Sequence, residues 1–344
     1  NLYHIFSKHR WNVCDCSGLV FCPTDVRPVV LLQHGLCGAS TDYLVSPANQ
    51  SLAFLLADAG ADVWLGNMRG NSYSKQHKHL SPSHSDFWRW SFDEMARYDI
   101  PAMIDYVLKV TNRKQLFYVG HSQGCSTMLI HGSRDKYITS KVRHFYALSP
   151  AARLQQTTGF TQKIVKIREI FKTFFNGVFH GSTDVGLFTN IAIVEIICKT
   201  EGLAFCRDKL FKMFGDDVRA FNTVRSFILI TVRLSAGLGT VKNGVFENYD
   251  EGSPEANRKR YGQPTPPAYD LKGFQLPISV YYGGSDVLVA PGDVEWLLTQ
   301  IKAEYVQRIG HYNHIDFVWA MDAPDTIYSH LIKHMFHLER LSPQ

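Results

Sequence analysis

The stretch "FYVGHSQGCSTMLI", Phe117–Ile130, joins a short apolar run to an apolar helical pattern through a serine that lies between two glycines. The pentapeptide Gly120–Gly124 fits the pattern G-x-S-x-G, in which a sharp turn between a strand and a helix exposes the serine oxygen. The glycines are needed because the strained backbone of such a turn leaves no room for neighbouring side chains. The stretch therefore predicts that Ser122 is a nucleophile, and the alternative is an ordinary serine in a tight structural turn.

Short apolar runs that end in turn residues recur on both sides of this stretch and alternate with helical patterns. The predicted strands span residues 27–35, 61–67, 115–120, 142–150, 276–286 and 303–310. Helical patterns span residues 51–60 and 91–111, where Pro101 predicts a kink, and a further helix follows Ser122. Strands that alternate with helices favour a mostly parallel sheet covered on both faces. The sequence thus predicts an α/β fold with Ser122 at the carboxyl edge of the sheet, where such folds bind ligands.

The alternation of strands and helices stops between Arg153 and residue 263. This interval is helical in pattern and rich in phenylalanine, and it lies between two predicted strands of the sheet. We therefore predict a core made of residues 1–152 and 264–344, with residues 153–263 inserted as a cap. Residues 251–270, rich in glycine, proline and charge, are predicted to lead back to the core. Apolar residues at helical spacing over residues 164–178 fit a core-facing helix or a helix beside an acyl pocket.

A nucleophilic serine needs a base and a group that orients the base, and both have candidates after the later strands. Asp286 ends a predicted strand, where its carboxylate could orient an imidazole. His314 follows the next predicted strand and could take the serine proton and later return it to the leaving alcohol. The weaker candidates are Asp293, inside a predicted helix, and His311, closer to the strand end. For His314 the alternative interpretation is a surface-loop histidine.

Hydrolysis by a serine also requires backbone N–H groups that bind the negatively charged oxygen of the intermediate. Gln123 supplies one N–H as the residue after the nucleophile. The turn that follows the strand of residues 27–35 supplies another, for which we select Leu36. His34, in the same turn, is interpreted as structural rather than catalytic.

The composition limits the classes of function. The 344-residue chain contains 45% hydrophobic and 19% charged residues, which is typical of a globular protein. Its net charge of +5 comes from basic residues scattered along the chain, and this distribution argues against nucleic-acid binding. No apolar run is long enough to span a bilayer, and the seven cysteines lack zinc-binding spacing. Asn49 begins the one N-x-S/T triplet and is a candidate N-glycosylation site.

Five long strings of the sequence are specific enough to compare with known families. They are "RPVVLLQHGL" (27–36), "NQSLAFLLADAGADVWLGNMRGNSYSKQHKHLSP" (49–82), "FWRWSFDEMARYDIPAMIDYVL" (87–108), "QLFYVGHSQG" (115–124) and "NHIDFVWAMDAP" (313–324). These strings resemble the acid lipase family of α/β hydrolases, the group of gastric and lysosomal lipases. The resemblance covers roughly residues 27–150 and 246–344, with a looser match through the predicted cap. It implies an α/β-hydrolase fold with a mostly parallel sheet and an inserted, mainly helical cap.

The same resemblance implies an activity and a set of site residues. Matched by motif, the family's nucleophile falls on Ser122, its acid on Asp286, its base on His314, and its oxyanion donors on Leu36 and Gln123. Family members hydrolyse triacylglycerols or sterol esters without a metal or organic cofactor, so the implied partner is neutral lipid at an oil–water or membrane interface. The implied location is secreted or lysosomal. Cys198 and Cys206 resemble the family's cap disulfide, and the alternative is two buried thiols.

The chain departs from the family in two places. The family usually begins with an antiparallel hairpin that carries a D-G-Y-x-L element, and "NLYHIFSKHRWNVCDCSGLVFCPTDV" (1–26) lacks it. We therefore expect either that those edge strands are missing or that this start is not the native one. In the predicted cap, "ITVRLSAGLGTVKNGVF" (230–246) lacks the His/Gln-bearing helix expected before "FENYDEG", which leaves the acyl-chain preference open.

From the sequence we expect a serine ester hydrolase of neutral lipids that forms an acyl-enzyme on Ser122. Two alternatives are kept beside it. A carboxylesterase of small esters would use the same residues, whereas a non-catalytic relative would use the pocket to bind or carry lipid. The intact set of Ser122, Asp286 and His314 argues against the non-catalytic alternative.

Overall fold

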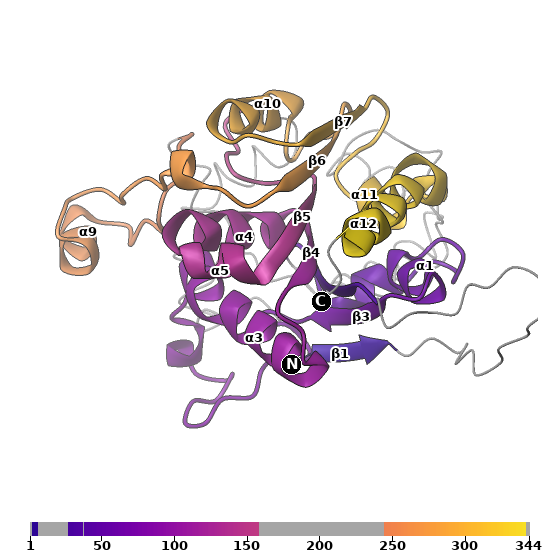
Figure 1. Cartoon of the computed structure of the whole chain (residues 1–344). Coiled ribbons are helices and arrows are strands. Elements are labelled where there is room, and N and C mark those ends of the chain that lie inside the picture. The colour runs from indigo at the N-terminus through magenta and orange to yellow at the C-terminus, as the bar shows by residue number, and fades with distance from the viewer. Residues whose placement is uncertain (1, 6–26, 37, 158–243, 342–344) are drawn as a thin grey trace, which may run out of the picture.

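A sheet whose central strands are buried along nearly their whole length forms the core of the protein. The structure is a computed structural model in which residues 2–5, 27–36, 38–157 and 244–341 are described. Within these ranges the strand order is β1-β3-β2-β4-β5-β6-β7 (Figure 1). The strands are β1 (Leu2–Ile5), β2 (Val29–Gln33), β3 (Asp62–Gly66), β4 (Leu116–His121), β5 (Val142–Leu148), β6 (Ile278–Gly283) and β7 (Tyr305–Ile309). Neighbouring strands from β2 to β7 run parallel, which confirms the predicted fold class.

The structure differs from the sequence prediction at one edge of this sheet. Strand β1 runs antiparallel to β3, and their register places His4 opposite Trp64. The two rings stack with their centroids 4.3 Å apart, and His4 Nε2 lies 2.5 Å from Asp62 Oδ1. The expectation that the edge strands are missing is therefore wrong for Leu2–Ile5. A four-residue strand without a motif is defined by its partner strand, which explains why the sequence pattern does not reveal it.

Helices cover both faces of the sheet and form a hydrophobic core with each (Figure 1). One face carries α3 (Ile100–Thr111), α4 (Gln123–Arg134), α5 (Lys136–Lys141) and α10 (Pro291–Gln300). The other carries α1 (Leu52–Asp58), α11 (Asp316–Trp319) and α12 (Ser329–Leu341). Because each helix packs its apolar stripe on the sheet, the carboxyl ends of the strands stay available for loops that carry polar side chains.

The helix predicted over residues 91–111 changes its winding before Pro101. It begins as α2 (Phe92–Glu94), continues through a π-helical turn at Met95–Asp99 and becomes α3 at Ile100. Proline has no backbone N–H, and its ring clashes with the carbonyl four residues earlier. In the π-turn the N–H of Ile100 instead bonds to the carbonyl of Met95, five residues back. The predicted kink is thus a wider helical turn placed directly before the proline.

Shorter elements complete the described fold. They are 3₁₀ turns at Ser40–Tyr43, Ser85–Trp88 and Leu271–Gly273, and a π-turn at Pro324–Tyr328.

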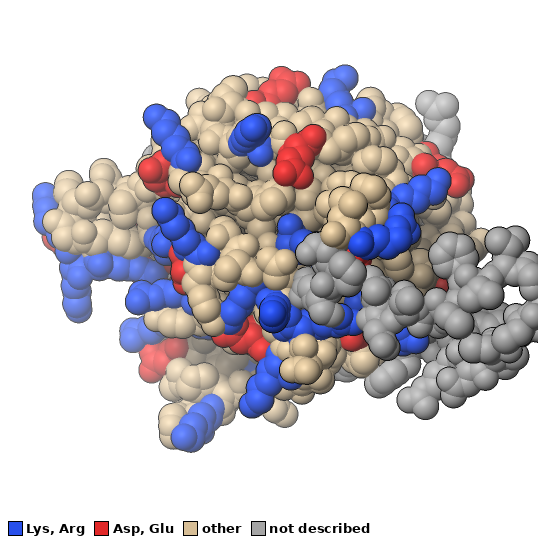
Figure 2. Space-filling model, viewed as in Figure 1, with Lys and Arg blue, Asp and Glu red and all other residues tan. Residues whose placement is uncertain are grey.

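On the face drawn in Figure 2, Lys and Arg side chains lie among acidic and uncharged residues rather than in one continuous stripe. None of the helices in the described ranges is long and apolar enough to cross a membrane.

Residues 158–243, most of the predicted cap, lie outside the described residues, so the division into core and cap is still a prediction. The chain returns to the core through residues 244–270, which contain α9 (Pro254–Tyr261). Ser253 caps this helix by accepting a hydrogen bond from the N–H of Ala256 at 3.1 Å, and Gly262 ends it with φ 76°. The predicted linker therefore contains a short helix with a cap at each end.

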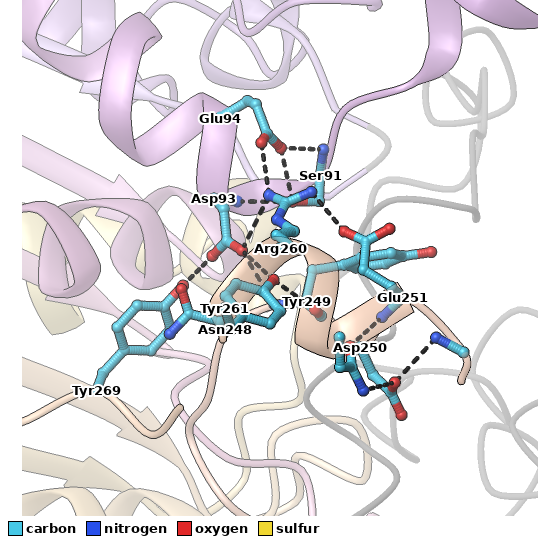
Figure 3. A network of polar contacts seen from close by, with 12 residues as sticks. Ser91, Asp93, Glu94, Asn248, Tyr249, Asp250, Glu251, Arg260, Tyr261 and Tyr269 are labelled. Carbon is cyan, nitrogen blue, oxygen red and sulfur yellow. Dashed lines mark hydrogen bonds and ion pairs between the residues drawn. The ribbon is translucent and has the colours of Figure 1, made fainter. Parts of the chain in front are cut away.

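A polar network holds the returning segment against α2 (Figure 3). Arg260 of α9 forms an ion pair with Glu94 at 2.6 Å and lies 3.6 Å from Asp93 Oδ2. Asp93 is only 5% exposed, and it accepts hydrogen bonds from the Tyr249 N–H at 3.0 Å and from the Tyr269 hydroxyl. Because buried donors and carboxylates need each other as partners, this network fixes where the chain re-enters the core.

Replacing Asp93 with alanine removes an acceptor that several buried donors share. We expect the free energy of unfolding to fall by about 3 kcal/mol in urea denaturation, because those donors are left unpaired. Asp86→Ala is the control, since its ion pair with Arg89 spans 3.3 Å between side chains that are 60% and 81% exposed. The control should change stability by less than about 0.5 kcal/mol. Equal losses in the two variants would contradict this role of Asp93.

Candidate active site

Ser122 occupies a strained turn between β4 and α4. Strand β4 ends at His121, α4 begins at Gln123, and the backbone of Ser122 has φ 52° and ψ −116°. Residues with a side chain rarely adopt a positive φ, and this conformation presents the serine at the carboxyl edge of the sheet. The Ser122 N–H donates to the carbonyl of Leu148 at 3.0 Å, which ties the turn to the end of β5.

Close packing explains the two glycines of the motif. A Cβ atom on Gly120 would lie 2.9 Å from the carbonyl carbon of Gly124. A Cβ atom on Gly124 would lie 2.5 Å from the carbonyl oxygen of Gln33, at the end of β2. The atoms in the way belong to the backbone, so a larger residue at either position would push α4 away from the sheet and open the turn.

The structure brings the three predicted catalytic residues together in one chain of hydrogen bonds. His314 Nε2 lies 2.8 Å from Ser122 Oγ, and His314 Nδ1 lies 2.8 Å from Asp286 Oδ2. Asp286 follows β6 and His314 follows β7, so both come from loops at the carboxyl ends of strands. The three residues are 6%, 2% and 3% exposed in the order Ser122, Asp286 and His314. Such a chain can accept the hydroxyl proton as the serine attacks a carbonyl.

The weaker sequence candidates have other partners. Asp293, in α10, accepts hydrogen bonds from Arg153 Nε at 3.0 Å and from the Gln156 N–H at 2.8 Å. The side chain of His311 is 52% exposed, and its Nε2 lies 3.3 Å from Asp322 Oδ2. Neither residue takes part in the hydrogen-bond chain that starts at the serine.

The predicted oxyanion donors lie on two backbone segments that meet beside Ser122. Gln123 is the first residue of α4, so its N–H has no acceptor within the helix. Leu36 lies in the turn after β2, and a Cβ atom on the preceding Gly35 would lie 3.0 Å from Ser122 Cβ. The turn therefore passes close to the serine. The assignment of Leu36 and Gln123 as oxyanion donors is still a prediction, and Cys37 lies outside the described residues.

Two buried histidines beside the serine are held uncharged. His34 Nδ1 donates to the carbonyl of Gly35 at 2.8 Å, and its Nε2 accepts from the Met68 N–H at 3.1 Å. His121 Nε2 donates to the carbonyl of His314 at 2.8 Å. Burial lowers the pKa of His34 to about 4 and the pKa of His121 to about 3. His34 therefore has structural contacts, as the sequence suggests. His121 anchors the backbone of His314, a role that its variable position in the motif does not reveal.

A second serine touches the same chain of hydrogen bonds. Ser149 follows β5, and its hydroxyl donates to Asp286 Oδ2 at 2.6 Å, while its Oγ lies 3.0 Å from His314 Nδ1. Ser149 belongs to no motif. The strand predicted over residues 142–150 includes Ser149, and its one sequence signal is that this strand ends at the edge of the sheet where Asp286 and His314 also lie.

The remaining predicted sites are an N-glycosylation site and a disulfide. Asn49 is exposed in the segment before α1, where a glycan could be attached. Cys198 and Cys206 lie outside the described residues. Among the residues that are described, no group of three or more His, Cys, Asp or Glu side chains is arranged to hold a metal ion.

Comparison with known proteins identifies similar sequences over most of the chain. The family model of the α/β hydrolase fold matches residues 28–183. Over 322 residues the chain is 41% identical to gastric triacylglycerol lipase of Homo sapiens and 40% identical to that of Bos taurus. It is 39% identical over 334 residues to Lipase lipl-1 of Caenorhabditis elegans. Each of these three alignments covers 90% of this chain and 80% of the relative.

Solved structures share the fold at low sequence identity. A membrane phospholipase A, described as a bacterial virulence factor, matches with a TM-score of 0.51 and 13% identity over 92% of this chain and 81% of that chain. VinJ matches with a TM-score of 0.50 and 18% identity over 91% of each chain. At these identities the similarity concerns the fold alone.

Replacing His34 with glutamine tests the uncharged burial of this residue. The unfolded chain protonates His34 below pH 6.5, whereas the folded chain does so only near its pKa of about 4. Folding therefore loses stability as the pH falls from 6.5 to 4, by up to about 3 kcal/mol from this residue. The variant should be less stable than the parent at pH 7, and its deficit should shrink by that amount at pH 4 in urea denaturation. A deficit that stays constant with pH would contradict the expectation.

Proposed function

This chain belongs to the lipase family of α/β hydrolases that includes gastric triacylglycerol lipase, and we propose that it hydrolyses neutral lipid esters through Ser122, His314 and Asp286. As a member of this family it is a carboxylic ester hydrolase. The observation that carries the proposal is the unbroken chain of hydrogen bonds from Ser122 Oγ through His314 to Asp286, with 2.8 Å at each step.

In the proposed first half-reaction, Ser122 Oγ attacks the ester carbonyl while His314 Nε2 takes the hydroxyl proton. Asp286 keeps Nδ1 of the imidazole protonated and stabilises the imidazolium as it forms. The carbonyl oxygen becomes an oxyanion that accepts hydrogen bonds from the N–H groups of Leu36 and Gln123. When the carbon–oxygen bond to the alcohol breaks, His314 gives its proton to the leaving alkoxide, and the acyl group stays on Ser122.

The proposed second half-reaction uses the same groups in the opposite direction. Water takes the place of the alcohol, and His314 Nε2 removes one of its protons as its oxygen attacks the acyl-enzyme carbonyl. The same backbone N–H groups bind the second oxyanion. When the bond to Ser122 Oγ breaks, His314 returns the proton to the serine and the fatty acid leaves. Because no proton has to reach bulk water during these steps, the buried position of the three side chains suits the mechanism.

The proposed substrates are triacylglycerols or sterol esters at an oil–water or membrane interface. The relatives of Homo sapiens and Bos taurus are triacylglycerol lipases, and their identity of 41% and 40% to this chain supports the same class of substrate. The predicted acyl pocket depends on residues 153–263, of which 158–243 lie outside the described part of the chain. The choice between glycerol and sterol esters is therefore left to experiment.

We propose a secreted or lysosomal location on the strength of the resemblance to gastric and lysosomal lipases. In such a compartment Asn49 would carry an N-linked glycan, and its exposure before α1 suits that modification. Cys198 and Cys206 would form the cap disulfide under the same oxidising conditions.

A series of esters tests the proposed activity. We expect the parent protein to prefer emulsified long-chain triacylglycerol or cholesteryl oleate to short soluble esters, and Ser122→Ala to reduce kcat by at least about ten-thousandfold while keeping the fold. Hydrolysis of short soluble esters alone would identify a small-ester carboxylesterase. Absence of hydrolysis, together with no labelling of Ser122 by a fluorophosphonate, would favour a lipid-binding relative. Full activity of Ser122→Ala would overturn the assignment of the nucleophile.

Expression in a secreting eukaryotic host tests the proposed modification. Treatment with an N-glycosidase should increase the electrophoretic mobility of the parent protein, because removal of the glycan reduces its mass. Asn49→Gln should migrate with the treated parent and should not respond to the enzyme. A parent protein whose mobility is unaffected by the treatment would contradict the glycosylation of Asn49.

A further inference from the structure

We propose that Ser149 is a positioning residue for the hydrolysis described above, and that its hydroxyl orients the Asp286 carboxylate and the His314 imidazole. The inference rests on the proposed function. It concerns a serine outside the G-x-S-x-G motif that reaches the reacting groups only through Asp286 and His314.

The first support is the complete set of donors around the carboxylate of Asp286. Oδ1 accepts from the N–H of Leu288 at 2.9 Å and of Val289 at 2.8 Å. Oδ2 accepts from the Ser149 hydroxyl at 2.6 Å and from His314 Nδ1 at 2.8 Å. A carboxylate has about four lone-pair sites, so these donors use all of them at a residue that is 2% exposed. Ser149 is the donor that shares an oxygen atom with the histidine.

The direction of the hydrogen bonds follows from the chemistry of the three groups. An ionised carboxylate only accepts, so the hydroxyl hydrogen of Ser149 points to Asp286. The remaining lone pairs of Oγ face His314 Nδ1, which lies 3.0 Å away. The hydrogen on Nδ1 therefore lies between two acceptors, Ser149 Oγ and Asp286 Oδ2. Each of the three side chains thus contacts the other two. Rotation of the carboxylate or of the imidazole would break two contacts instead of one.

The backbone of Ser149 provides independent support. Its φ is 46°, a conformation that glycine adopts without strain and that other residues rarely adopt. Its N–H bonds to the carbonyl of Tyr281 in β6 at 2.8 Å, while the preceding Leu148 accepts from the Ser122 N–H at 3.0 Å. The strained residue is therefore held between β6 and the nucleophile turn. A side chain at a position that favours glycine implies that the side chain itself is needed.

Two further histidines lie close to this pair. His121 of β4 has its ring centroid 5.0 Å from that of His314, and His34 lies beside His121. Burial lowers the pKa of these two histidines to about 3 and about 4, so neither adds charge above pH 4. Asp316, the first residue of α11, accepts from the Asn313 N–H at 2.6 Å. Ser149 therefore acts on the hydrogen bond between Asp286 and His314.

The test compares Ser149→Ala with Ser149→Gly, which both lose the hydroxyl while only glycine relieves the backbone. We expect kcat on a soluble ester to fall about tenfold in both variants with KM unchanged. The rate at which a fluorophosphonate labels Ser122 should fall in parallel. Ser133→Ala, whose hydroxyl bonds to the carbonyl of Ile130 within α4, is the matched control and should behave as the parent.

A purely structural role would give a different pattern. Activity would then follow thermal stability, and Ser149→Gly would retain more of it than Ser149→Ala, because glycine accepts the positive φ. In an Asp286→Asn background, Ser149→Ala should cost little further activity if the hydroxyl acts through the carboxylate. Parent-like kcat and labelling rate in both Ser149 variants would overturn the positioning role and leave Ser122 as the nucleophile. A parent protein that neither hydrolyses esters nor is labelled would overturn the proposed function and this inference together.

Discussion

The positive φ of Ser122 persists because three neighbouring strands hold the backbone around it. The N–H of Ser122 bonds to Leu148 at the end of β5, and Gly124 packs on the carbonyl of Gln33 at the end of β2. Strand β4 supplies the turn itself. The central order β2-β4-β5 is thus a requirement of the turn as well as a feature of the fold. If one strand shifted, the serine would relax and its oxygen would no longer face the imidazole.

Burial around this turn limits which side chains can carry a charge. His34 and His121 are close to the serine, yet their lowered pKa values keep them uncharged. The carboxylate of Asp286 is therefore faced by one imidazole, which becomes charged in the proposed reaction, and its other donors are neutral N–H and hydroxyl groups. Low polarity in the surroundings strengthens the interaction between the carboxylate and an imidazolium. The same surroundings make an unpaired polar atom costly, which accounts for the full set of partners at Asp286.

Local sequence predicts those residues of the site that lie in a motif or at the end of a strand. Ser122 lies in a pentapeptide that needs only its own glycines, and Asp286 and His314 stand after apolar runs that the sheet requires. Their hydrogen bonds could not be read from the sequence, because 192 residues separate Ser122 from His314. Ser149 and His121 escape sequence reasoning for the same reason, since their partners lie 137 and 193 residues away. Strand β1 is not predicted either, because it is a strand through its antiparallel pairing with β3 and has no sequence pattern of its own.

The separation of 192 residues between Ser122 and His314 also orders events during synthesis. The chain is made from its amino end, so β2, β3, β4 and β5 leave the ribosome well before the loop that carries His314. At about 5–20 residues per second, the interval between the two residues is about 10–40 s. During that time the turn around Ser122 can form, because its strands are present, but the proposed base has not yet been made. If Ser122 is the nucleophile, the nascent polypeptide therefore stays inert toward esters until the loop that carries His314 has emerged and meets the serine.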